Sequence, residues 1–236
     1  TRQAKREAIV AFLLEKHRRQ EPVLLVTRTI EEAKALVDRI RQEVPFARLL
    51  TAENEAEEPE IIRHAGELGA ITVATGMAGR GTDIRLAEGA RQLTVVVTEP
   101  SLNRRTDRQA RNRAGRWGEP GETHLFASVD DEVFVRFAPG LVSKLLAGGL
   151  TVFDPEQSKA AVEHAQRAAE AFGRLRRVAT QRFGDELAEA RAEFFSQMRQ
   201  HPVRLADMQQ AWSALLEWLT AQARRHPDEY ATPLPE

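Results

Sequence analysis

A glycine-rich loop with two opposite charges lies in the first half of the chain, in the segment Thr75-Gly76-Met77-Ala78-Gly79-Arg80-Gly81-Thr82-Asp83-Ile84. Glycine has no Cβ, so Gly79 and Gly81 leave their backbone N–H groups accessible to an anion. Arg80 and Asp83 add a cation and a carboxylate beside them. A nucleotide has partners for both, because it carries phosphates and ribose hydroxyls. A tight turn that needs glycine for its backbone angles is the alternative interpretation.

An arginine cluster follows the glycine-rich loop. Between residues 101 and 118 there are six arginines and one acidic residue, namely Arg104, Arg105, Arg108, Arg111, Arg113, Arg116 and Asp107. Arg104, Arg108 and Arg111 share one helical face; Asp107 can pair with one of them, or the three can contact another domain. Arg113 and Arg116 lie three residues apart, at a helix end or in the loop after it. A planar guanidinium there can reach a phosphoryl group in transfer, which is arginine-finger chemistry. A solvated basic face is the alternative.

Apolar segments alternate with helical patterns over the first 148 residues, and this alternation should position both motifs. The predicted strands are 22–27, 47–52, 70–75, 92–98 and 122–128, and helices are predicted over 4–19, 30–40, 57–66 and the arginine cluster. Such alternation predicts an α/β fold with a parallel sheet covered on both faces. The glycine loop directly follows the strand that ends at Thr75. Ligands of open α/β sheets bind outside the carboxyl ends of the strands, so the position favours phosphate binding.

A second, all-helical region is predicted for residues 149–236. Asp154 should cap a helix, with Gln157 as its capping-box partner. Apolar residues at helical spacing then continue from Val162 to Phe194. His201-Pro202 ends this pattern, and a second amphipathic helix follows, which predicts a helical hairpin.

These motifs together resemble the SecA-type preprotein translocase ATPases. The resemblance runs in order from the glycine loop through Gln109-Ala110-Arg111-Asn112-Arg113-Ala114-Gly115-Arg116-Trp117-Gly118 to Ser128-Val129-Asp130-Asp131-Glu132. It implies a RecA-like second nucleotide-binding domain, similar to a helicase C-terminal domain, at residues 1–148, followed by a helical scaffold at 149–236. The family usually has Asn at Gly76 and Gly at Asn112. We expect these two departures to remove hydrogen bonds near the nucleotide and to shift the arginine loop.

The resemblance also implies a site and its ligands. Arg113 and Arg116 would act as catalytic arginine fingers on the γ-phosphate of ATP, and the residues that bind the nucleotide would be Gly79, Arg80, Gly81, Asp83 and Gln109. The chain has no Gly-x-x-x-x-Gly-Lys-[Ser/Thr] loop. ATP or ADP with Mg²⁺ would therefore be held by an upstream Walker-containing motor domain, which would supply the Mg²⁺ ligands. The six histidines are scattered, so no metal site is predicted within this chain.

Composition limits the partners and the location. The chain carries 34 basic and 35 acidic residues, for a net charge of −1, so nucleic acid is not expected as the main ligand. It has no cysteine, which agrees with a reducing compartment. No apolar run approaches the roughly 20 residues that span a bilayer. We expect a cytoplasmic protein, or one peripheral at the inner face of the cell membrane. Its partners would be an unfolded preprotein, a SecY-type channel, the anionic membrane surface and, in a homodimer, a second copy.

The predicted function is therefore the C-terminal motor half of a SecA-like ATPase that couples ATP hydrolysis to protein translocation. Such a half would be incomplete as an enzyme without its Walker motifs. Two alternatives remain open from the residues. One is a catalytically degenerate module that senses nucleotide or acts as a scaffold, which the substitutions at Gly76 and Asn112 keep open. The other is the C-terminal domain of a nucleic-acid helicase, because helicases share this domain and its arginine motif.

Overall fold

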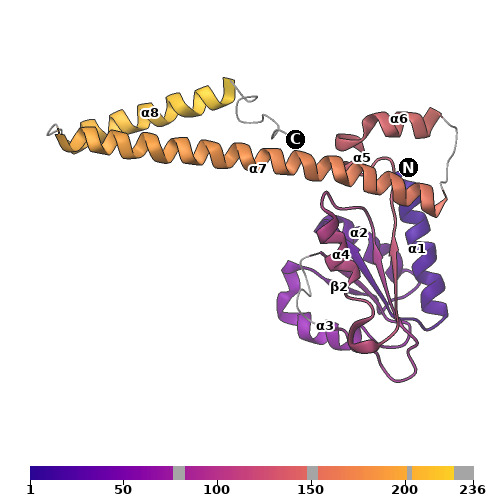
Figure 1. The fold of residues 1–236 in the computed structure, drawn as a ribbon. Coiled ribbons are helices and arrows are strands. Elements are labelled where there is room, and N and C mark those ends of the chain that lie inside the picture. The colour runs from indigo at the N-terminus through magenta and orange to yellow at the C-terminus, as the bar shows by residue number, and fades with distance from the viewer. Residues whose placement is uncertain (77–82, 148–153, 201–203, 226–236) are drawn as a thin grey trace. The chain divides into compact units, whose positions relative to one another are not determined.

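The computed structural model describes residues 1–76, 83–147, 154–200 and 204–225 (Figure 1). It divides into two compact units, Thr1–Ala169 and Glu170–Glu236. The predicted domain boundary at residues 148 and 149 falls in a segment outside the described residues, and it remains a prediction. The two units are described separately below.

A five-stranded parallel sheet forms the centre of the first unit. Its strands are β1 (Val23–Thr27), β2 (Arg48–Leu50), β3 (Ile71–Thr75), β4 (Leu93–Val97) and β5 (Gly121–Leu125). They are arranged in the order β2-β3-β1-β4-β5, and every neighbouring pair is parallel. Every residue of β1, β3 and β4 is buried, because strands inside a doubly covered sheet face helices on both sides. The predicted α/β fold with a RecA-like parallel sheet is confirmed.

Helices cover both faces of this sheet. On one face, α1 (Arg2–Arg18) and α2 (Ile30–Arg41) pack against the strands through a core that includes Ile9, Leu13 and Ile40. On the other face, α3 (Glu58–His64) and α4 (Arg104–Arg111) contribute to a second core. A short 3-10 helix, η1 (Ala52–Glu57), precedes α3. The arginine cluster therefore lies on a helix that packs against the sheet.

A third hydrophobic cluster joins the last helices of the first unit. It contains residues of α5 (Glu132–Phe137) and of the beginning of α7 (Pro155–Gln200), with partly buried residues of α6 (Pro139–Ala147) packed against it. The carboxylate of Asp154 accepts hydrogen bonds from the backbone N–H groups of Glu156 and Gln157, both at 2.9 Å. The predicted helix start at Asp154 is thus confirmed.

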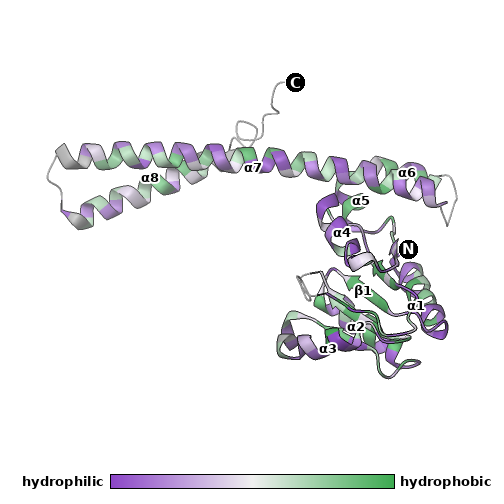
Figure 2. Cartoon of the chain, turned by 60° about the horizontal axis from the view of Figure 1, so that its bottom comes forward, coloured by the Kyte–Doolittle hydropathy of each residue, from purple (hydrophilic) through white to green (hydrophobic). Residues whose placement is uncertain are grey.

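The second unit is a helical hairpin formed by the remainder of α7 and by α8 (Leu205–Arg225). Trp212 of α8 packs against Phe194 and Phe195 of α7, with ring centroids 5.3 Å and 6.0 Å apart. Figure 2 shows hydrophilic and hydrophobic residues interleaved along both helices. Within the described ranges, no helix is long and apolar enough to cross a membrane. The predicted hairpin is confirmed.

Candidate functional site

The arginine loop begins where α4 ends. The side chain of Asn103 caps the start of α4 by accepting a hydrogen bond of 2.7 Å from the backbone N–H of Arg105. The helix ends at Arg111 and is capped by Asn112. Arg113 comes next, and Arg116 is the first residue of the short 3-10 helix η2 (Arg116–Gly118). We call residues 112–118 the arginine loop. Its two arginines lie just beyond the helix, as their spacing predicts.

Arg116 is joined to Asp83, the carboxylate at the end of the glycine-rich segment. Its Nη1 donates to Asp83 Oδ1, and its Nε donates to the backbone oxygen of Asn112 at 2.9 Å. The indole Nε1 of Trp117 donates to the other oxygen, Oδ2, of Asp83 at 3.0 Å. The hydrogen bond from Arg116, followed by that from Trp117, holds the pKa of Asp83 below its ordinary value. Asp83 is therefore a charged acceptor at neutral pH.

Arg113 contacts the other end of the same segment. Its Nη2 donates to the backbone oxygen of Gly76 at 3.3 Å. Gly76 directly follows β3, and its N–H donates to the backbone oxygen of Thr27, at the end of β1, over 3.1 Å. Residues 77–82 thus lie between two residues, Gly76 and Asp83, that are each bonded to an arginine of the arginine loop. Gly76 thus brings the arginine loop to the carboxyl end of β3, the edge at which α/β sheets bind ligands.

Of the other residues predicted to bind the nucleotide, only Gln109 lies in the part of the chain that the structure describes. Gly79, Arg80 and Gly81 lie outside the described residues. Gln109 is an exposed residue of α4. Among the described residues it makes no hydrogen bond to Asp83, Arg113 or Arg116. Their roles in binding nucleotide remain predictions.

The two departures from the resembled pattern sit in ordinary backbone positions. Asn112 has φ −67° and ψ 5°, which any residue adopts, so nothing in the loop requires glycine there. A Cβ at Gly76 would find its nearest neighbour, the backbone oxygen of Thr27, 4.0 Å away. A side chain therefore fits at both positions, and the effect of the two departures on nucleotide binding and on the placing of the arginine loop remains a prediction.

The arginine loop is shaped by residues with positive φ. Gly115, Trp117 and Gly118 have φ values of 66°, 58° and 79°. The first residue of β5, Gly121, packs so closely that a Cβ on it would lie 2.2 Å from the backbone nitrogen of Gly115. Contacts this short do not occur, so the approach of β5 to the arginine loop depends on glycine at position 121.

Trp117 is a member of this site that sequence reasoning did not select. Its residue surface is 68% exposed. The guanidinium of Arg85 lies over its ring, 4.6 Å from the centroid. One feature of the sequence could have indicated it: the indole N–H of Trp117 is a polar group that usually finds a hydrogen-bond partner, and it lies next to a predicted arginine finger.

A buried hydrogen-bond network ties α4 to α7. Asp107 accepts from the backbone N–H of Ser101 at 2.9 Å and from Nε2 of Gln166 at 2.6 Å. Gln166 also donates to the backbone oxygen of Ser101 at 2.8 Å. Both side chains are buried. Asp107 was expected to pair with a neighbouring arginine, but its hydrogen bonds come from Ser101 and Gln166, because its side chain faces α7.

A buried ion pair secures the acidic segment before α5. Lys5 of α1 contacts Asp131 at 2.5 Å, and both side chains are almost fully buried. Burial raises the pKa of Asp131, while Lys5 and the backbone N–H of Ser128 favour its charged form. Asp131 directly precedes the first residue of α5, at its N-terminus. We therefore assign Asp131 a structural role.

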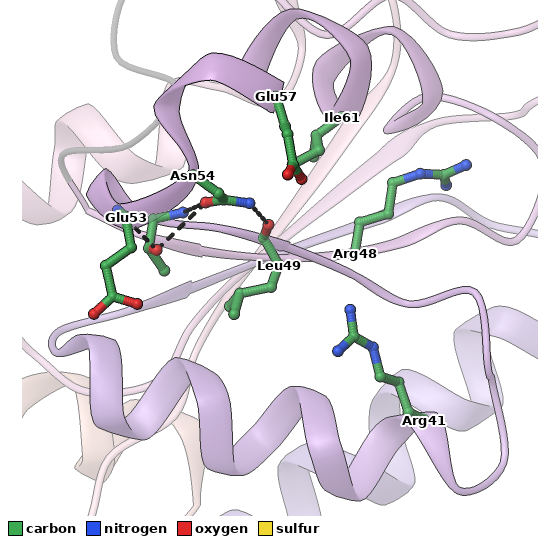
Figure 3. Close-up of a pocket in the computed structure, with 8 residues that line it drawn as sticks. Arg41, Arg48, Leu49, Glu53, Asn54, Glu57 and Ile61 are labelled. Carbon is green, nitrogen blue, oxygen red and sulfur yellow. Dashed lines mark hydrogen bonds between the residues drawn. The ribbon is translucent and has the colours of Figure 1, made fainter.

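An open pocket beside β2 lies apart from these residues (Figure 3). Asn54 organises its floor, because its side chain donates to the backbone oxygen of Leu49 at 2.6 Å and accepts from the N–H of Thr51 at 2.8 Å. Arg41 and Arg48 also line it. Of the predicted site residues that the structure describes, Asp83, Gln109, Arg113 and Arg116, none lines it.

Solved structures that align with part of this chain include a DEAD-box protein and part of an ATPase domain. The Escherichia coli DEAD-box protein SrmB, bound to a regulator of ribonuclease activity, aligns with a TM-score of 0.46 and 21% identity, over 61% of this chain and 80% of that chain. The C-terminal part of the Fun30 ATPase domain aligns with a TM-score of 0.43 and 18% identity, over 69% of this chain and 54% of that chain.

Curated relatives are more similar in sequence. The protein translocase subunits SecA of Clostridium novyi and Caldicellulosiruptor saccharolyticus are each 38% identical, over 207 and 206 residues. Each match covers 84% of this chain and 24% of the relative, so the chain spans about a quarter of their length. The family model of the SecA P-loop domain matches residues 1–94 and 87–151. The chain therefore belongs to the SecA P-loop domain family.

Proposed function

We propose that this chain is the second nucleotide-binding domain of a SecA-like motor, at residues 1–148, followed by part of its helical scaffold, at 149–236. The motor would couple ATP hydrolysis to protein translocation. Arg113 and Arg116 would act as arginine fingers on ATP held with Mg²⁺ by an upstream Walker-containing domain. One observation carries the proposal: Arg113 bonds Gly76 and Arg116 bonds Asp83, at the two ends of the glycine-rich segment.

The geometry of Arg116 suits phosphate recognition. Its Nε and Nη1 are anchored, while Nη2 makes no hydrogen bond within the part of the chain that the structure describes. The side chain keeps 34% of its surface exposed. Because two nitrogens of the guanidinium are already held, the third can bind a phosphoryl oxygen with little further loss of side-chain entropy. A positive charge that is already in position before the reaction stabilises the transition state most effectively. With the upstream domain closed onto this site, Gly79, Arg80, Gly81, Asp83 and Gln109 would line the nucleotide cleft.

The contact between α4 and α7 suits a coupling role. Because Gln166 binds both Asp107 and the backbone of Ser101, a shift of α4 during closure on ATP would act directly on the beginning of α7. We propose that α7 transmits this motion to the parts of the motor that handle an unfolded preprotein. A SecY-type channel and the anionic inner surface of the cell membrane would be the corresponding partners, and the protein would be cytoplasmic or peripheral at that membrane.

The test is Mg-ATP turnover by the full-length protein, with and without membrane vesicles that contain the channel and an unfolded secretory protein. We expect these additions to stimulate the wild type and Arg91→Ala, whose side chain is exposed just before β4, but not Arg116→Ala. Nucleotide binding without turnover in the wild type would indicate a degenerate sensing module. Salt-dependent binding of single-stranded nucleic acid, with turnover stimulated by it, would indicate a helicase.

A further inference from the structure

Trp117 combines three features that packing alone does not explain. It is a large aromatic residue with 68% of its surface exposed. Its backbone is left-handed, with φ 58°, a conformation that is unfavourable for a residue with a Cβ. Its indole N–H nevertheless reaches a specific acceptor, Asp83 Oδ2, at 3.0 Å. A backbone outlier in a functional segment points to a role for the side chain that it aims.

The acceptor of Trp117 is also the anchor of Arg116. Asp83 has two carboxylate oxygens, of which Oδ1 accepts from Arg116 and Oδ2 from Trp117. With Oδ2 held by the indole, the carboxylate cannot rotate about its Cβ–Cγ bond without breaking a hydrogen bond. The plane of the carboxylate then fixes the plane of the guanidinium, because charge-assisted hydrogen bonds are directional.

Arg85 fixes the indole in turn. Its guanidinium lies 4.6 Å from the ring centroid, in the range where a cation is attracted to an aromatic face. Arg85 is two residues after Asp83 in the sequence, so the same short segment supplies both the acceptor of the indole N–H and the cation over its ring. The ring is therefore located by two contacts despite its exposure.

We propose that Trp117 is a positioning residue for Arg116, which acts by fixing the carboxylate of Asp83. The inference rests on the proposed function, since it concerns the orientation of the same arginine finger. Trp117 holds Asp83, Asp83 holds Nη1 of Arg116, and Nη2 of Arg116 is thereby directed at the phosphoryl group. Loss of the indole N–H leaves Arg116 present but free to reorient, which lowers the rate of the chemical step and leaves ATP binding intact.

The test compares Trp117→Phe and Trp117→Gln in the full-length protein. Phe keeps an aromatic ring for Arg85 and lacks the N–H, whereas Gln supplies an amide N–H at a similar reach. For Trp117→Phe we expect kcat to fall on the order of 5- to 10-fold, with the KM for ATP changed by less than about twofold. Trp117→Gln should recover at least half of the lost kcat. Trp218→Phe, at an exposed residue of α8, is the matched control and should leave kcat unchanged.

The outcomes separate this inference from the proposed function. If Arg116→Ala removes turnover but Trp117→Phe retains wild-type kcat, the positioning role is wrong and the finger role stands. If Arg116→Ala itself turns over normally, the proposed function fails. A fall in kcat that Trp117→Gln does not rescue would show that the N–H is not the group that matters. A fall accompanied by a lower melting temperature would show that the substitution acts through stability. Either result would overturn the positioning role.

Discussion

Gln166 of α7 donates a hydrogen bond of 2.6 Å to the carboxylate of Asp107 on α4, although the two residues are 59 positions apart. Both side chains are buried, so neither can exchange this partner for water. A buried carboxylate that loses a hydrogen-bond donor is strongly destabilised, because its desolvation is no longer offset. This contact therefore fixes the helix that precedes the arginine loop to the first turns of α7.

Replacement of Gln166 by Leu should destabilise the first unit. The substitution removes the donor to Asp107 and to the backbone oxygen of Ser101. We expect the free energy of unfolding to fall by about 1–3 kcal/mol, measured by chemical denaturation. Arg167→Ala, at the exposed neighbouring position, is the control and should change the free energy by less than about 0.5 kcal/mol. Equal stability of the two variants would mean that the network does not anchor α4.

Asp83→Asn should lower turnover by the same factor at every pH between 5.5 and 8. The hydrogen bonds from Arg116 and Trp117 hold the pKa of Asp83 below its ordinary value. A depressed acid pKa means that the pairing is present at higher pH and is lost only as the pH falls through that lowered pKa. Asp83 thus remains ionised over the whole window. A ratio of wild-type to variant kcat that changes with pH in this range would show that Asp83 titrates there.

Gly121→Ala should disturb the arginine loop from outside it. The added methyl group would lie 2.2 Å from the backbone nitrogen of Gly115 and 2.9 Å from the carbonyl carbon of Ala114, so the backbone must move. We expect a loss of about 1–3 kcal/mol in the free energy of unfolding, together with lower turnover. Gly140→Ala provides the comparison, because a Cβ there meets no atom within 4 Å. If Gly121→Ala turned over ATP at the wild-type rate, the conformation of the arginine loop would not matter for hydrolysis.

Much of the fold could be predicted because buried parallel strands have a simple sequence pattern. The continuous apolar runs that became β1, β3 and β4 are buried on both faces, and turn residues separate them from helical patterns. The end of α4 and the location of Arg113 and Arg116 beyond it also followed from local spacing. Sequence patterns over short ranges were sufficient to predict an element wherever the contacts that form it join residues close in the sequence.

The contacts within the site were harder to predict because they join distant residues. The partners of Asp107 could not be chosen from its helix alone, since its neighbouring arginines were plausible partners and the actual one, Gln166, lies on α7. Trp117 could not be selected as a site residue from the sequence, because an exposed aromatic residue in a left-handed conformation is exceptional. Only the tertiary position of Asp83 supplies the acceptor for its indole N–H. The backbone angles of Asn112, which need no glycine, likewise could not be read from the sequence.

The most direct test of the central claim is a single-turnover measurement on the full-length protein with Mg-ATP. It gives the affinity for ATP and the rate of hydrolysis separately for the wild type, Arg113→Ala, Arg116→Ala and the control Arg91→Ala. If the two arginines act as fingers, each finger variant should bind ATP within a few-fold of the wild type but hydrolyse it about 10³-fold more slowly or worse, while Arg91→Ala matches the wild type. Hydrolysis by both finger variants at the wild-type rate would contradict the claim.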